Sequence, residues 1–206
     1  MNYHQNYLKS INTGLNLTEF TVSSAPVKGD DFFIEITALA KKVKNNRGRM
    51  FFIGNGASAS FSNHMALDWT KNGKIPSFSL SDSSMLTALA NDFDYATAMR
   101  EFIKLYEINH KDLVITTSSS GNSENIVNVL RYCNQMNIDT LTFSGLKKDN
   151  ASIELGHYSL FVPLKTYGMV ECIHQVFHHL WLDRYMGIEE WNKKEEQNMN
   201  NENFRL

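Results

Sequence analysis

The stretch ITTSSSGNSEN, residues 115–125, constrains the fold of this chain more than any other. It follows the apolar run 113–115, and apolar residues recur at helical spacing in the segment 126–130 behind it. The sequence therefore predicts a buried strand that runs into a helix through a turn rich in hydroxyl side chains. Backbone N–H groups and the positive end of the helix dipole meet in such a turn, and both favour an anion. The alternative is a Ser-rich helix cap, because Ser and Asn are preferred cap residues.

A second strand, turn and helix of the same kind lie earlier in the chain. The strand 49–53 is followed by the turn GNGAS, residues 54–58, and then by a helical pattern. Its glycines let the backbone approach a ligand closely. Two such turns with short hydroxyls predict a cradle for a phosphate monoester that offers hydrogen bonds but no fixed charge. Neither turn has the spacing of a dinucleotide or a Walker loop, so we expect no nucleotide cofactor.

Strands alternate with helices along most of the chain, which predicts an α/β fold. We expect a doubly wound, five-stranded parallel sheet flanked by helices, with right-handed crossovers. Residues 1–47 are predicted to be helical in two pieces that pack on the sheet or on another subunit. Residues 48–186 would form the α/β domain, and the polar residues 187–206 a mobile tail. The five predicted strands are 49–53, 77–80, 113–115, 139–143 and 158–162.

Length, charge and cysteine content exclude several classes of protein. A chain of 206 residues with 42% hydrophobic residues is long enough for one domain with a substantial core. A net charge of −2 with mixed signs argues against a nucleic-acid surface. Cys133 and Cys172 have no metal or redox spacing and predict reduced thiols in a cytoplasmic protein. No apolar run approaches the roughly 20 residues that span a membrane, and no signal-peptide pattern begins the sequence.

Ionisable side chains gather on two of the predicted helices. His64 and Asp68 stand four residues apart and therefore share one helix face. Glu171, His174 and His178 fall on one stripe of the last predicted helix. Histidines at this spacing are typical of metal ligands, and the same spacing also arises in ordinary packing. A His–Asp pair one turn apart is also common on protein surfaces.

Four motifs, in order, resemble the sugar isomerase (SIS) domain, and within it most closely the phosphoheptose isomerase family. That family interconverts sedoheptulose 7-phosphate and glycero-manno-heptose 7-phosphate. The resemblance spans about residues 30–186 and includes an N-terminal helical extension. It implies the SIS fold and a homotetramer with sites between subunits. The motifs are GNGASASFSNHMALD (54–68), ALANDFDYATAM (88–99), ITTSSSGNSENIVNVL (115–130) and Glu-x6-His in the last helix.

Carried over residue by residue, the resemblance implies a binding site for a phosphorylated sugar. The turn after the first strand would line the site, an Asn-Asp pair would bind sugar hydroxyls, and the Ser-rich turn would hold the phosphate. Ala57 replaces the family's usual second glycine. The implied substrate-binding residues are Asn55, Gly56, Ala57, Ser58, Asn91, Asp92, Ser118, Ser119, Ser120 and Ser123.

The resemblance also implies a zinc site and an acid/base pair. His64, Asp68 and His178 match metal-ligand positions, and Asp68 with His178 would move the protons of the reaction. Asp68 stands where the family has Glu, which shortens the side chain by one methylene. The family's Gln ligand maps onto Val170, which cannot bind a metal. Glu171 or His174 would substitute for it if the helix is rotated.

Three functions remain open at this point. The first is an aldose–ketose isomerase of sedoheptulose 7-phosphate that works through an enediol and feeds surface-polysaccharide heptose synthesis. The second is an isomerase or related enzyme on another sugar phosphate. The third is a non-catalytic SIS protein that binds a sugar phosphate or a protein partner as a regulator. The retained ionisable residues on two facing helices favour an enzyme.

Overall fold

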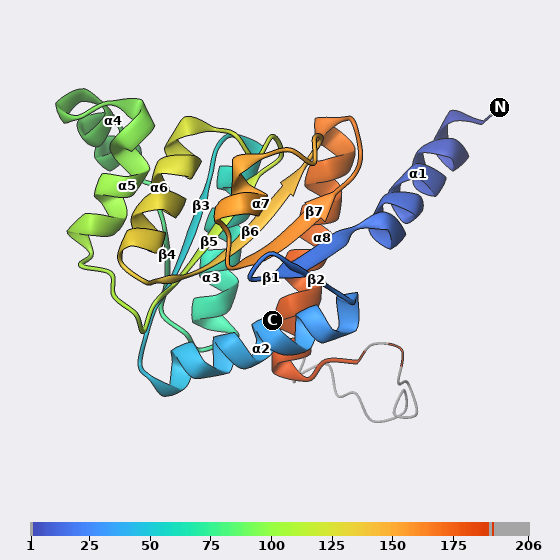
Figure 1. The fold of residues 1–206 in the computed structure, drawn as a ribbon, viewed down its shortest axis with the longest axis horizontal. Helices are drawn as coiled ribbons and strands as arrows, with labels where there is room; N and C mark the ends of the chain where they lie inside the picture. Colours follow the sequence, from blue (N-terminus) through green and yellow to red (C-terminus); the bar gives the residue numbers. More distant parts are fainter. Residues whose placement is uncertain (1, 190, 192–206) are drawn as a thin grey trace.

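The inner strands bury both of their faces, as parallel strands between two layers of helices must. In β3 (Met50–Gly54), Met50 and Phe52 belong to one hydrophobic core, and Phe51 and Ile53 belong to the other. The first core is covered by α2 (Gly29–Asn45), α3 (Ala57–Lys71) and α8 (Tyr167–Met186). The second is covered by α4 (Ser83–Asp92), α5 (Tyr95–Leu105), α6 (Glu124–Gln135) and α7 (Ala151–Leu155). The computed structural model describes residues 2–189 and 191, and it is a three-layer α/β/α arrangement (Figure 1).

All five predicted strands form and run parallel to one another, which confirms the fold class. The chain goes from β3 to β4 on one side and then crosses back to β5 on the other side. This reversal makes a crevice at the carboxyl ends of β3 and β5, where ligands of doubly wound sheets bind. Besides β3, the parallel strands are β4 (Ser77–Ser79), β5 (Leu113–Ser118), β6 (Asp139–Gly145) and β7 (Tyr158–Val162).

The prediction of only helices in residues 1–47 was wrong in one place. β1 (Glu19–Val22) pairs antiparallel with β7, and β2 (Ala25–Val27) pairs antiparallel with β1, so the sheet has seven strands in the described part of the chain. Ser23 and Ser24 join the two strands with φ of 48° and 66°. A two-residue turn with both φ positive matches the twist of a hairpin. Pro26 fits because β2 is an edge strand.

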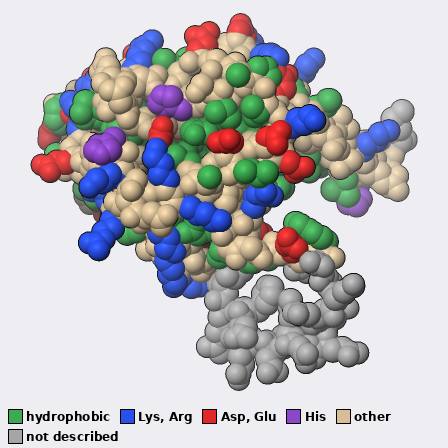
Figure 2. Space-filling view, turned by 60° about the horizontal axis from the view of Figure 1, so that its bottom comes forward, with side chains coloured by type: hydrophobic (Ala, Val, Ile, Leu, Met, Phe, Trp, Pro, Cys, Tyr) green, Lys and Arg blue, Asp and Glu red, His purple; other side chains and the backbone are tan. Residues whose placement is uncertain are grey.

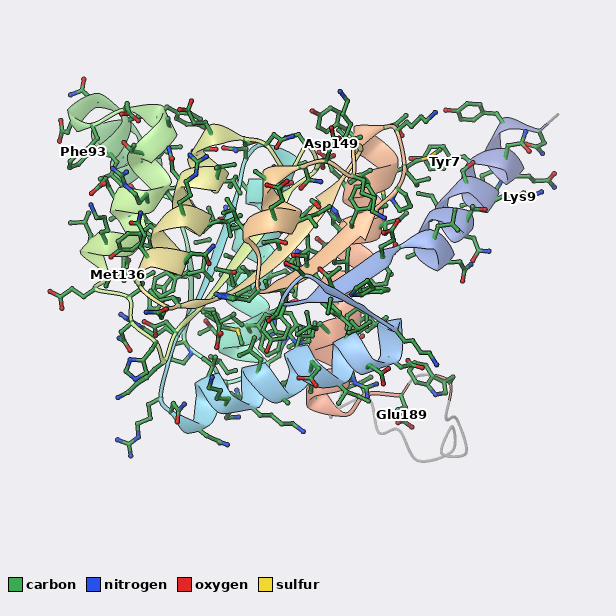
Figure 3. All side chains as sticks on the ribbon, in the orientation of Figure 1. Tyr7, Lys9, Phe93, Met136, Asp149 and Glu189 are labelled. Carbon is green, nitrogen blue, oxygen red and sulfur yellow. The ribbon has the colours of Figure 1, made fainter. Side chains whose placement is uncertain are left out.

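Helices fill both faces of the sheet, and α1 projects from the body (Figure 1). Tyr7 of α1 faces the start of α8, where its hydroxyl lies near Gly168, while Lys9 points away (Figure 3). None of the helices in the described part is both long enough and apolar enough to cross a bilayer. The helices are α1 (Tyr3–Leu17), α2 (Gly29–Asn45), α3 (Ala57–Lys71), α4 (Ser83–Asp92), α5 (Tyr95–Leu105), α6 (Glu124–Gln135), α7 (Ala151–Leu155) and α8 (Tyr167–Met186).

Both predicted domain boundaries stay predictions. Helix α2 shares one hydrophobic core with the parallel strands, so this part of the section 1–47 is packed on the sheet. Most of the predicted tail, residue 190 and residues 192–206, lies outside the described residues.

Two histidines of α8 lie in the core between that helix and the sheet. His174 Nε2 lies 3.0 Å from the carbonyl oxygen of Ser144. His178 Nε2 lies 3.0 Å from Thr117 Oγ1, and its ring stacks on Phe143 at 3.9 Å between centroids. Burial lowers the pKa of His174 to about 4 and the pKa of His178 well below 6.5. Both imidazoles are therefore neutral at physiological pH.

This burial predicts that the folded state loses stability in mild acid. Between about pH 6.5 and pH 4, His174 is protonated in the unfolded chain but stays neutral in the folded chain. The free energy of unfolding should fall between pH 6.5 and about pH 4, by on the order of 3 kcal/mol from this residue. Urea unfolding across this pH range measures the change. In His174→Leu the dependence should weaken, whereas in His110→Leu, which alters an exposed histidine, it should not. Equal pH dependence in both variants would contradict the assignment.

Candidate functional site

A pocket of about 310 Å³ lies where the sheet topology reverses. The loop after β3, the loop after β5 and the first turn of α8 surround it. The register Gly54 opposite Thr117 brings the ends of the two strands together, and each loop begins there. The pocket is lined by Asn55, Gly56, Ala57, Ser58, Thr117, Ser118, Ser119, Ser120, Ser123, Tyr167 and Glu171.

Three helices begin at this pocket without a side-chain cap. Helices α3, α6 and α8 have no hydrogen bond from a cap side chain to their first turn. Among the other described helices, only α2 shares this property, and α1, α4, α5 and α7 are each capped by an Asn or Asp side chain. The N–H groups of the first two residues of α3, α6 and α8 thus remain for a ligand, whereas those of Ala59 and Ile126, the third residues of α3 and α6, already have acceptors. The helix dipoles favour a negative ligand.

One serine hydroxyl of the Ser-rich loop is buried and has no hydrogen-bond partner within the described residues. Ser119 is 5% exposed, and its Oγ has no hydrogen-bond partner in the described part of the chain. Ser118 Oγ donates to Ser123 Oγ at 3.4 Å, and Ser120 Oγ accepts from Asn122 N at 3.3 Å. A buried unpaired hydroxyl costs free energy, so a ligand oxygen is its natural partner. No Lys or Arg is among the described residues that line the pocket.

Two glycines give the loops their shape. Gly56 has a φ of 55° and stands directly before α3. Gly121 has a φ of 65°, and a Cβ there would overlap Asn150 Oδ1. Asn150 is buried and caps α7, so Gly121 lets the Ser-rich loop pack against that helix. Any other residue at position 121 would be strained and would clash.

The predicted Asn-Asp pair does not line this pocket. Asn91 and Asp92 lie at the exposed C-terminal end of α4, and Asn91 Nδ2 donates to Asp92 Oδ1 at 3.0 Å. Their predicted contact with a sugar is therefore not made by the walls of the pocket in the same chain.

The structure brings two of the three predicted metal ligands together and replaces the third. His64, Asp68 and His179 offer ligand atoms that all lie within 4.8 Å of one another. His64 Nε2 is 3.3 Å from Asp68 Oδ2, and the His64 and His179 rings are 5.3 Å apart. The prediction of His178 in this cluster is corrected, because His178 is fully buried against Thr117. Successive helix residues point about 100° apart, so His178 faces the sheet while His179 points away from it.

Glu171 and His174, the predicted substitutes for the missing Gln ligand, do not belong to this cluster. His174 is fully buried and its Nε2 contacts the Ser144 carbonyl, so it is excluded as a ligand. Glu171 lines the Ser-rich pocket. Val170 is fully buried in the core.

Sequence reasoning missed His179 and Gln175. Gln175 Nε2 lies 2.7 Å from His179 Nε2, and Gln175 Oε1 is buried without a partner in the described part of the chain. The signal was present in the sequence: the apolar positions 170, 173, 177 and 181 define the buried face of α8. That face includes 178, and it leaves 175 and 179 on the side toward α3.

Known proteins match both the sequence and the fold of this chain. It is 27% identical over 152 residues to a phosphoheptose isomerase of Thermodesulfovibrio yellowstonii, covering 71% of this chain and 75% of that one. It is 30% identical over 145 residues to a phosphoheptose isomerase of Helicobacter pylori, covering 67% and 74%. The solved phosphoheptose isomerase of Neisseria gonorrhoeae superimposes with a TM-score of 0.75 at 19% identity, covering 90% and 96%.

The family model described as the SIS domain matches residues 35–145. That segment contains the loops after β3 and β5 that line the pocket, and the strands β3 to β6. The chain belongs to the SIS domain family.

Proposed function

We propose that this protein is an aldose–ketose isomerase that converts sedoheptulose 7-phosphate to glycero-manno-heptose 7-phosphate. The observation that carries the proposal is the pocket where three uncapped helix starts meet the unpartnered hydroxyl of Ser119. Such a pocket suits the phosphate of a sugar. The relatives named phosphoheptose isomerase support the choice of a seven-carbon sugar. Heptose made in this way would feed the synthesis of a surface polysaccharide.

The reaction needs a base and an acid near the carbonyl end of the sugar. One group removes the proton next to the carbonyl, and the other delivers a proton to the carbonyl oxygen. Asp68 and His179 are the ionisable pair that stands together, so His179 takes the role first given to His178. The enediol between the two steps carries negative charge that must be stabilised. Asp68 is one methylene shorter than the Glu of the family, so its carboxylate lies roughly an ångström closer to the backbone of α3 than a Glu carboxylate would.

The cluster His64, Asp68 and His179 fits a zinc ion. Two imidazoles and one carboxylate are the protein ligands of many catalytic zinc sites, which keep a fourth position open. The His64 side chain is 47% exposed, so the cluster is accessible from outside. When bound, zinc would polarise the carbonyl oxygen as a Lewis acid. Glu171, the predicted substitute ligand, lines the Ser-rich pocket instead, so Gln175 beside His179 is the candidate for a further protein ligand.

The acid/base pair and the Ser-rich pocket of one chain are not parts of one cavity, so we propose that a second copy completes the site. Neither Asp68 nor His179 lines the pocket that holds the phosphate. His179 instead lines a groove of about 1020 Å³ between α2 and α8, where Ile34, Val176 and Leu180 are exposed. Hydrophobic side chains gather near the middle of the face on the α2 side, with charged ones around them (Figure 2). These features support the proposed homotetramer with sites between subunits.

The proposed activity predicts turnover of sedoheptulose 7-phosphate. Purified protein with added zinc should produce the aldose, as followed by NMR. In Ser119→Ala the dissociation constant of the sugar phosphate should rise about 10- to 100-fold, because a hydrogen bond to a charged group is lost. Ser10→Ala, which changes a hydroxyl of α1 outside the pocket, should match the parent protein.

The outcomes separate the three functions. Turnover of a different sugar phosphate and not of the heptulose would favour the second function. Tight binding without turnover at any zinc concentration would favour the regulator, a role that the solved SIS-type transcription factor of Sphaerobacter thermophilus illustrates for this fold. Equal binding by Ser119→Ala and the parent protein would contradict the phosphate site.

The metal proposal predicts that zinc binding depends on His179. Because the ligand atoms of His64, Asp68 and His179 lie together, His64→Ala and His179→Ala should each weaken zinc affinity at least tenfold. Titration calorimetry with zinc, and the visible absorption of the cobalt-substituted protein, measure binding without reference to turnover. The exposed His110 lies outside the cluster, so His110→Ala should bind as the parent does. Unchanged affinity in His179→Ala would refute the ligand assignment.

The proposed assembly predicts a tetramer in solution. Light scattering after size exclusion at micromolar concentration should give about four times the chain mass of 23.6 kDa. Leu180→Glu, which places a charge on an exposed apolar position of the groove, should dissociate it and abolish turnover together. An active monomer would rule out sites between subunits.

A further inference from the structure

Two side-chain amides join the loops on either side of the pocket. Asn55 Nδ2 donates to Asn125 Oδ1 at 3.0 Å, and Asn125 Nδ2 donates to Asn55 Oδ1 at 2.9 Å. Asn55 follows β3 and lines the pocket, while Asn125 lies in the first turn of α6 and is 3% exposed. A third residue joins them, because Tyr95 at the start of α5 donates its hydroxyl to Asn55 Oδ1 at 2.8 Å.

A backbone group fixes the orientation of both amides. The N–H of Ile126 is shared between the Ser123 carbonyl and Asn125 Oδ1, each at 3.0 Å. Since a backbone N–H is only a donor, the Asn125 atom that receives it must be the oxygen. The Asn125 nitrogen then faces Asn55, and the reciprocal pair requires the Asn55 oxygen opposite it. Turning both amides over together would keep the reciprocal pair but would set the Asn125 nitrogen, a donor, against the N–H of Ile126.

With this orientation, three of the four hydrogen-bonding sites of the Asn55 amide are occupied. Its oxygen has two acceptor sites, and Tyr95 and Asn125 occupy both. Its nitrogen has two hydrogens, and Asn125 takes one. One N–H of Asn55 is left, on a side chain that lines the pocket. Asn55 therefore has a donor to give to a ligand and no acceptor.

We propose that Tyr95 and Asn125 are positioning residues that lock the Asn55 amide as a hydrogen-bond donor to an oxygen of the bound sugar phosphate. This inference rests on the proposed binding of a sugar phosphate and goes beyond it by assigning a polarity to one wall of the pocket. An acceptor oxygen, such as the carbonyl of the open-chain sugar or a phosphate oxygen, is favoured at that point. A sugar hydroxyl fits only with its oxygen as the acceptor.

A double-mutant cycle on Asn55 and Tyr95 tests whether Tyr95 acts through the amide. Tyr95→Phe removes one hydroxyl from a side chain that is 54% exposed, so it should scarcely change stability. It should raise KM and the dissociation constant of sedoheptulose 7-phosphate about 3- to 10-fold, the effect of one hydrogen bond, while kcat changes less than twofold. In the background of Asn55→Ala the same substitution should change neither value, because coupled residues are not additive. Asn125→Ala should behave as Tyr95→Phe does, with a larger effect.

Two controls separate positioning from a general effect on the fold. Asn128 Nδ2 donates to the Ala96 carbonyl and so also ties α6 to α5, yet it does not contact Asn55. Asn128→Ala should leave KM unchanged, and so should Tyr106→Phe at the other end of α5. An equal effect of Tyr95→Phe with and without Asn55 would overturn the inference, and so would a parent protein that binds no sugar phosphate.

The two proposals fail in different ways. If the parent protein turns the substrate over and the cycle is additive, the isomerase stands and the positioning role is lost. If the cycle shows coupling in the dissociation constant and no turnover is seen, the positioning role stands and the isomerase is lost. Asn125→Ala is used only if its thermal unfolding resembles that of the parent, and Tyr95→Phe decides the question alone otherwise.

Discussion

The site depends on the parallel pairing of β3 with β5. This pairing sets Gly54 opposite Thr117, so two loops from distant parts of the chain begin side by side. The reversal of strand order at that point keeps the space above them open, because the crossover helices leave in opposite directions. Each strand is buried on both faces, and this double burial holds the register. Unpaired donors from the helix starts then have one common place to converge.

Helix α8 contacts both the sheet and helix α3 through its histidines. Its inner face carries His174 and His178 into the core, where they remain neutral and bond to the sheet. Its side toward α3 carries His179, which meets His64 and Asp68. Adjacent histidines thus have opposite environments, one dry and one accessible. The contrast follows from helix geometry alone, since a turn of about 100° separates neighbours.

Sequence patterns predicted the parallel sheet and the two Gly- and Ser-rich loops after β3 and β5, because each rests on local signals. Buried strands of apolar residues and turns of Gly and Ser are visible in any short window. The short hairpin at 19–27 was missed, because four-residue strands show little alternation and Pro26 argued against a strand. The choice between His178 and His179 depended on the rotation of α8, which the apolar positions 170, 173, 177 and 181 indicate and which tertiary packing fixes. The contacts of Tyr95 and Asn125 join residues 40 and 70 positions from Asn55, beyond the reach of a local pattern.

The absence of Lys and Arg from the lining of the proposed phosphate pocket, among the residues described, has a consequence for how substrate would arrive. Dipoles and hydroxyls act over a few ångströms. Full charges attract a ligand over about 10 Å, which is the electrostatic screening length at 0.1 M salt. Without such attraction, the encounter rate would stay near that of neutral partners. Association would then respond little to ionic strength, and affinity would come from close fit after contact.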